Sequence, residues 1–100
     1  MDNISQKQTI TSADAGTKVL IMGAKGIFAS LTINTTSAQA LTLYDDKTIT
    51  SPGGSFAVVK ASIAEQTLNY GGNGIVLNKG LVVDVPGSYT GNATFAFKLS

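Results

Sequence analysis

Residues 26–34 carry the sequence GIFASLTIN, the clearest strand pattern in this chain of 100 residues. Successive side chains of a strand point to opposite sides of a sheet, so alternation of residue types predicts a strand with one buried face. The pattern places Ile27, Ala29, Leu31 and Ile33 on one face and residues 28, 30, 32 and 34 on the other. We therefore expect a half-buried strand, which is typical of antiparallel sheets.

The same alternation recurs along the chain. It predicts further strands at residues 6–11, 17–22, 41–44, 56–60, 66–70, 74–77, 81–85 and 95–99. Turn sequences rich in Gly, Pro, Asn and Ser separate them at residues 51–54, 71–74, 78–80 and 86–88. One helical turn is predicted over residues 61–66, where Ser62 and Glu65 have the spacing of a capping box.

These elements predict an all-β fold, a single antiparallel β-sandwich of the jelly-roll or immunoglobulin-like type with about seven to nine short strands. The chain has no composition shift that would mark a second domain. The predicted core consists of Ile27 or Phe28 together with Leu31, Ile33, Leu43, Val83, Val85, Phe95 and Phe97.

The composition excludes several classes of function. The chain has no His and no Cys, which removes the commonest general base, thiolate chemistry and the commonest metal ligands. Its basic residues are all Lys and are scattered, so a nucleic-acid partner is not expected. No stretch approaches the roughly 18 apolar residues of a membrane span, and residues 1–8 lack the apolar run of a signal peptide. We expect a soluble, non-enzymatic protein made in the cytoplasm, without a cofactor.

The acidic pair Asp45-Asp46 is the strongest candidate for chemistry. A glycosidase needs two carboxylates facing each other across about 5–10 Å, but adjacent strand residues point to opposite faces. Asp84 is a third carboxylate that could join them across the sheet, and oxygen-rich loops can bind a calcium ion. We expect instead a solvated turn after the strand at residues 41–44.

Two further features have simpler explanations than ligand binding. The glycine-rich loop at residues 71–74 precedes a predicted strand, whereas a phosphate site needs a helix N-terminus after the loop. Tyr44, Tyr70 and Tyr89 could stack on sugars, as in a carbohydrate-binding module, but scattered tyrosines more often pack at the edge of a core.

The low charge, 13% of residues, favours association with other chains. A surface of Ser, Thr, Asn and Gly with few charges suits partial coverage by other subunits better than a free monomer. Neutral strand positions around Thr32, Thr42 and Ala96 are therefore candidate contact residues.

Four segments together resemble the small β-sandwich virion proteins of tailed bacteriophages, the capsid decoration or cement proteins and related head and tail accessory proteins. They are GIFASLTIN at 26–34, LTLYD at 41–45, GIVLNKGLVVDV at 74–85 and TFAFK at 94–98. The resemblance covers about three quarters of the chain and leaves residues 1–16 outside.

The resemblance implies a non-enzymatic structural protein located in the virion, most simply one that binds and stabilises the assembled head. It implies the major capsid protein or other virion proteins as partners, and a homo-oligomer, with a trimer favoured. The alternatives are a tail or neck accessory protein and a small carbohydrate-binding surface module.

Residues 1–16 are predicted to form an N-terminal arm or edge strand beside the sandwich domain of residues 17–100. The segment is polar, and its large apolar residues are Met1, Ile4 and Ile10. So little apolar burial does not offset an ordering cost of about 1–2 kcal/mol per residue. We expect the arm to add as a strand to a neighbouring subunit or to the capsid protein, with Ile4 and Ile10 as contact residues. Deleting residues 2–12 should then leave the sandwich folded.

Overall fold

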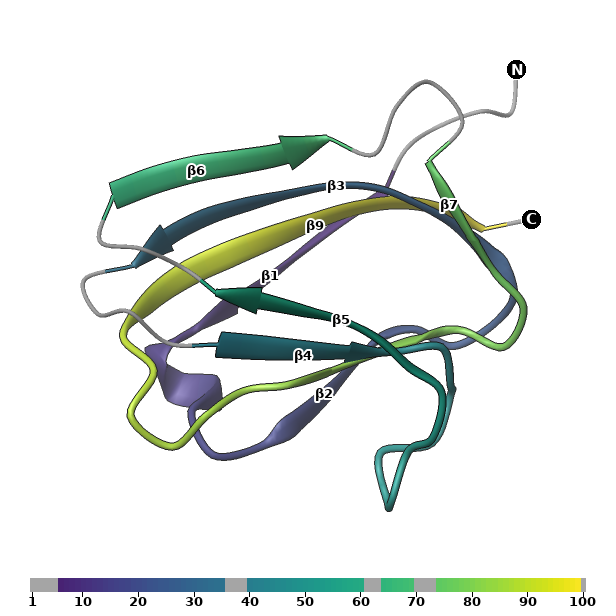
Figure 1. Ribbon diagram of the computed structural model, residues 1–100, viewed down its shortest axis with the longest axis horizontal. Helices are drawn as coiled ribbons and strands as arrows, with labels where there is room; N and C mark the ends of the chain where they lie inside the picture. Colours follow the sequence, from purple (N-terminus) through teal and green to yellow (C-terminus); the bar gives the residue numbers. More distant parts are fainter. Residues whose placement is uncertain (1–5, 36–39, 61–63, 70–73, 100) are drawn as a thin grey trace.

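The computed structural model describes residues 6–35, 40–60, 64–69 and 74–99. In this part of the chain there are nine strands and one short 3-10 turn (Figure 1). They are β1 (Gln6–Thr11), η1 (Ser12–Asp14), β2 (Lys18–Met22), β3 (Gly26–Thr35), β4 (Ala40–Tyr44), β5 (Ser55–Lys60), β6 (Ala64–Asn69), β7 (Ile75–Leu77), β8 (Leu81–Asp84) and β9 (Gly91–Leu99).

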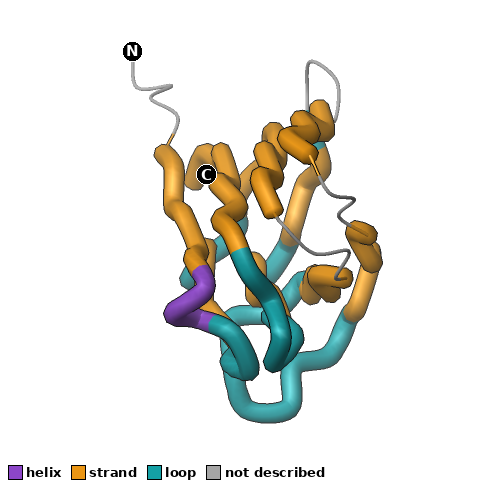
Figure 2. The backbone as a smooth tube through the Cα atoms, turned by 90° about the vertical axis from the view of Figure 1, so that its left-hand side faces the viewer, coloured by secondary structure: helices purple, strands orange, loops and turns teal. Residues whose placement is uncertain are grey.

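The strands form two antiparallel sheets that face each other. The first sheet has the order β1-β9-β3, and β6 and β7 pair with the remaining side of β3. The second sheet has the order β2-β8-β4-β5. Figure 2 shows the two layers nearly end-on, with η1 connecting one layer to the other at one side. The prediction of an all-β antiparallel sandwich is confirmed.

The pairing is nested, which decides between the two predicted topologies. β4 pairs with β5, β3 with β6 and β7, β2 with β8, and β1 with β9. The chain is therefore one long hairpin whose tip is the loop at residues 45–54, rolled so that successive pairs fall in alternate sheets. This is the strand order of a jelly roll and not that of an immunoglobulin domain.

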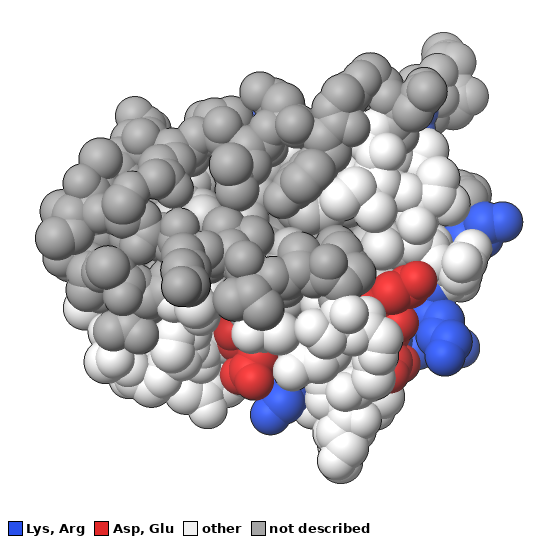
Figure 3. Space-filling view, viewed as in Figure 1, with Lys and Arg blue, Asp and Glu red and all other residues white. Residues whose placement is uncertain are grey.

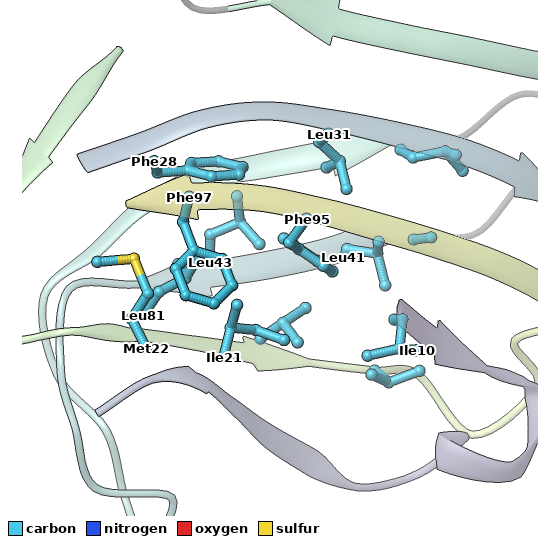
Figure 4. Packing of buried hydrophobic residues seen from close by; sticks show 14 of the residues in the cluster. Ile10, Ile21, Met22, Phe28, Leu31, Leu41, Leu43, Leu81, Phe95 and Phe97 are labelled. Carbon is cyan, nitrogen blue, oxygen red and sulfur yellow. The ribbon is translucent and has the colours of Figure 1, made fainter. Parts of the chain in front are cut away.

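The core lies between the two sheets (Figure 4). Phe28 and Leu31 from β3 and Phe95 and Phe97 from β9 meet apolar side chains of β2, β4 and β8. The rings of Phe28 and Phe95 are tilted, with centroids 5.9 Å apart, a favourable arrangement for aromatic pairs. Phe28 is buried, as one of the two alternatives had it, and the other predicted core residues are buried too.

The alternation predicted for residues 26–34 is wrong in its first half. Phe28 is paired with Phe97, but the next paired residue is Ser30, opposite Ala96, so Ala29 is an extra residue in β3. Such a β-bulge shifts the side-chain alternation by one. Phe28 consequently faces the core with Leu31 and Ile33, whereas Ile27 is only half-buried.

The helical turn predicted over residues 61–66 is also wrong where the structure describes it. Ala64–Asn69 is strand β6, because pairing with β3 overrides the local capping pattern. Residues 61–63, including Ser62, lie outside the described residues. A capping box occurs instead at η1, where the Asp14 carboxylate accepts the N–H of Thr11 at 2.9 Å and Thr11 Oγ1 accepts the N–H of Ala13 at 3.2 Å.

The segment predicted as an arm or edge strand contains an edge strand of its own domain. β1 pairs with β9 from Gln6 opposite Phe97 to Thr11 opposite Asn92. Ile10 on this strand is 1% exposed and belongs to the core cluster. The expectation that Ile10 contacts another protein is therefore wrong, because a single buried isoleucine together with a full ladder anchors the strand in place.

Candidate functional site

The outer face of the first sheet is the candidate site, and it is built by strand alternation. Ala93, Phe95 and Phe97 of β9 point into the core, so the residues between them point outward. On β3, burial of Leu31 and Ile33 turns their neighbours outward in the same way. The outer face comprises Lys7, Thr9 and Thr11 of β1, Asn92, Thr94, Ala96 and Lys98 of β9, Ile27, Ser30, Thr32 and Asn34 of β3, and Val76 of β7.

A row of threonines crosses this face. Thr9 pairs with Thr94 and Thr94 with Thr32, so one threonine stands at the same level on each of three strands. The hydroxyls of Thr9 and Thr94 are 2.9 Å apart and share a hydrogen bond. Cross-strand Thr pairs of this kind stabilise a sheet and leave a surface of short side chains.

The rows on either side are also short and mostly neutral. Asn92 and Asn34 pair on one side of the threonine row, and Ala96 and Ser30 pair on the other. Lys7 and Lys98 carry the charge among the outward side chains that the structure describes on this face. Four strands at the usual spacing and a nine-residue β9 give a face of roughly 20 by 30 Å, or about 600 Å². This is below the roughly 800 Å² per partner of a standard interface.

The contact residues predicted from the sequence lie on different surfaces of the structure. Thr32 and Ala96 lie together on the outer face of the first sheet. Thr42 alternates with the buried Leu41 and Leu43 of β4, and is paired with Asp84, so it lies on the outer side of the second sheet. Ile4 is outside the described residues.

The carboxylates of Asp45 and Asp46 bind backbone groups. Asp45 accepts N–H groups of the β7–β8 turn, at 2.9 Å from Lys79, 3.2 Å from Asn78 and 3.4 Å from Gly80. It thereby ties the tip of the rolled hairpin to a turn 33 to 35 residues further along the chain. In Figure 3 acidic and basic side chains lie next to one another around the loops at this part of the molecule.

Asp46 organises the loop at residues 45–54 itself. It accepts N–H groups at 2.7 Å from Lys47, 2.9 Å from Gly53 and 3.3 Å from Thr48. The hydrogen bond from Gly53, followed by that from Lys47, lowers the pKa of Asp46 below its usual value. The solvated turn expected here is a loop in which the carboxylates replace missing backbone acceptors.

Other candidate ligand residues are dispersed. Asp84 ends β8 between Lys18 and Thr42 in register, and within the described residues no three acidic side chains gather into a group that could bind a metal ion. Gly74 has a positive φ of 66° and is followed by strand β7, so the glycine-rich sequence leads into a strand and not into the helix N-terminus of a phosphate site. Residues 70–73, including Tyr70, lie outside the described residues.

The two described tyrosines differ in exposure. Tyr44 is half-buried at the end of β4, paired in register with Val82. Tyr89 is 2% exposed, and its hydroxyl has no hydrogen-bond partner among the described residues. Burial raises the pKa of Tyr89. Neither ring is a freely exposed stacking surface.

Sequence reasoning found the neutral character of this surface but not the threonine row. Alternate threonines were visible at positions 9, 32 and 94, but their alignment depends on which strands pair and in which register.

Comparisons with protein-family models, with curated proteins and with solved structures found no match. The described part of the chain contains no helix that is long and apolar enough to span a bilayer.

Proposed function

We propose that this protein is a non-enzymatic structural component of a tailed-bacteriophage virion, a decoration or cement protein that binds the assembled head through the outer face of the first sheet. It is made in the host cytoplasm and works on the particle. The observation that carries the proposal is the threonine row with its mostly neutral neighbours, because a broad surface made mainly of short uncharged side chains can be desolvated with little buried charge.

Two further observations support it. Jelly rolls are the architecture of many viral capsid proteins, although the fold alone assigns no function. The carboxylates that would serve a catalytic or cation site are engaged by backbone N–H groups at the loops.

The carbohydrate-binding alternative has less support. It calls for an exposed aromatic ring beside a free Asp or Asn. Tyr44 is half-buried, and the carboxylate of its neighbour Asp45 accepts backbone hydrogen bonds.

A particle-binding assay tests the proposed surface. Purified protein is mixed with phage particles that lack it, and bound chain is measured by co-sedimentation. Thr32→Lys should weaken binding by at least about tenfold, since a lysine in the centre of a neutral interface is desolvated without a partner. Thr42→Lys is the matched control, because Thr42 is on the opposite side of the sandwich.

Both variants should keep the unfolding midpoint of the parent protein within a few degrees, which separates lost binding from lost folding. Full binding by the Thr32→Lys variant, or loss of binding only in the Thr42→Lys variant, would show that the outer face of the first sheet is not the docking surface.

A further inference from the structure

The two sheets have four edges, and these differ in how readily another strand could pair with them. The pairing of edge strand β2 shifts between Leu20 and Met22, and that of edge strand β5 is irregular opposite Leu43 and Tyr44. On the far side of the first sheet the edge is divided between β6 and β7. β1 and β6 are each edges of six residues paired without a shift, but β6 shares its side of β3 with β7, whereas β1 is the one described strand along its side of the first sheet. Irregular edges resist strand addition and regular ones permit it.

The open side of β1 can be assigned residue by residue. The N–H of Thr11 is bonded to the Asp14 carboxylate, so it points away from β9. Backbone groups of an antiparallel strand alternate between its two sides, so Lys7 and Thr9 also present their N–H and C=O groups at the open edge. Their side chains are exposed. Asp14 occupies the end of the edge, which leaves the groups of Lys7 and Thr9 for a partner.

We propose that two copies of this chain pair through β1, antiparallel about a two-fold axis at Gln8. In this register Lys7 faces Thr9 of the second copy, and Thr9 faces Lys7 of the second copy. The two pairs exchange four backbone hydrogen bonds and place no like charges directly opposite each other. The side-chain faces also match, because paired residues lie two positions apart and therefore point the same way.

The second copy is the occupant because this edge is complementary to itself. Among the described residues, the backbone groups of Lys7 and Thr9 lie on either side of Gln8, as a pair with its two-fold axis there requires. The two first sheets would join into one sheet, and their outer faces would become one surface of about 1,200 Å². That exceeds the roughly 800 Å² per partner of a standard interface, which a single copy does not reach.

The hydrogen-bonded pairing does not depend on the proposed function; only the area argument rests on it, because that argument takes the outer face as a docking surface. A two-fold edge contact gives a dimer, in contrast to the trimer that the resemblance implies. The contact is small, so we expect a dissociation constant on the order of 1–100 µM.

Sedimentation equilibrium over about 1 µM to 1 mM tests the pairing. The parent chain should approach twice its 10.3 kDa mass as concentration rises. Thr9→Pro removes an edge N–H that no described strand of the same chain uses, so it should leave a folded monomer. Thr94→Lys is the matched control: it alters the same threonine row on an interior strand, and the dimer should persist.

A charge exchange tests the register. Thr9→Lys places a lysine opposite Lys7 of the second copy and should weaken the dimer about tenfold. Adding Lys7→Glu should restore dimerisation, since the introduced glutamate then faces the introduced lysine. A monomer at about 1 mM, a trimer, or a dimer unaffected by either Thr9 substitution would overturn the proposal. A dimer that never binds particles would instead contradict the proposed function alone.

Discussion

Gly80 occupies a position that no other residue can fill without moving the backbone. Its φ is +154°, and an added Cβ would lie 2.9 Å from the carbonyl oxygen of Asp46 and closer still to that of Met22. We expect Gly80→Ala to lower the free energy of unfolding by at least about 2 kcal/mol. Gly53→Ala is the control, because its Cβ meets nothing within 4 Å. Urea denaturation of both variants measures the difference, and equal losses would refute the argument.

The hydroxyl of Tyr89 tests how much free energy a buried polar group without a hydrogen-bond partner costs. It is buried without a partner among the described residues, which costs free energy relative to a phenyl ring. Tyr89→Phe should therefore raise the free energy of unfolding by about 1 kcal/mol in the same denaturation experiment. A loss of stability would mean that the hydroxyl forms a hydrogen bond in solution.

The stability that Asp46 contributes through the loop at residues 45–54 depends on pH. Backbone hydrogen bonds lower its pKa in the folded state, so its carboxylate stabilises the fold above the unfolded pKa of about 3.9. That contribution is lost as the pH falls through the lower folded pKa. Thermal unfolding from about pH 7 to pH 2 should show a steeper acid loss for the parent than for Asp46→Asn. Parallel curves for the two proteins would count against this role.

At the scale of the elements, β1 is part of the fold. Ile10→Ala should cost about 2–5 kcal/mol because it empties a fully enclosed site, and Lys7→Ala, exposed on the same strand, should change stability by less than about 0.5 kcal/mol.

Deleting residues 2–12 should abolish or severely weaken folding, the opposite of what the sequence suggested. Circular dichroism melts decide the matter, and a truncated chain that melts like the parent would show that β1 is dispensable.

The sequence predicted the strands well because alternation and turn residues are local properties. Each strand was located to within a few residues, and the predicted core of β3, β8 and β9 is buried. The bulge at Ala29 was not predictable, since an extra residue is defined only against the register of β9. The sequence predicts β6 as a strand but also a helical turn at its start, because the capping pattern is local whereas the pairing with β3 is not.

The site was predictable only in character. Low charge indicates a neutral surface, and Thr32 and Ala96 do lie together on the outer face of the first sheet. Thr42 was grouped with them because it has the same local pattern, yet β3 and β4 fall in different sheets. Burial of Ile10 depends on the long-range pairing of β1 with β9, across almost the whole chain. Contacts between distant segments are what local patterns leave undetermined.

At the scale of the whole molecule, the loops at the tip of the rolled hairpin differ from the outer face of the first sheet. The loops around Asp45 and Asp46 close one part of the sandwich with charge-assisted hydrogen bonds. The outer face of the first sheet offers a regular neutral surface built by β1, β9 and β3. Under the proposed function, such a surface would bind by shape and area, and repetition on a symmetric particle would compensate for a small individual contact.

Cryo-electron microscopy of purified, salt-washed virions tests the central claim most directly. The proposed function predicts a jelly-roll density on the particle at a fixed stoichiometry, with the face that bears Thr9, Thr94 and Thr32 turned toward the shell. Particles that lack the chain, or that carry it with this face turned to solvent and free of contacts, would contradict the account.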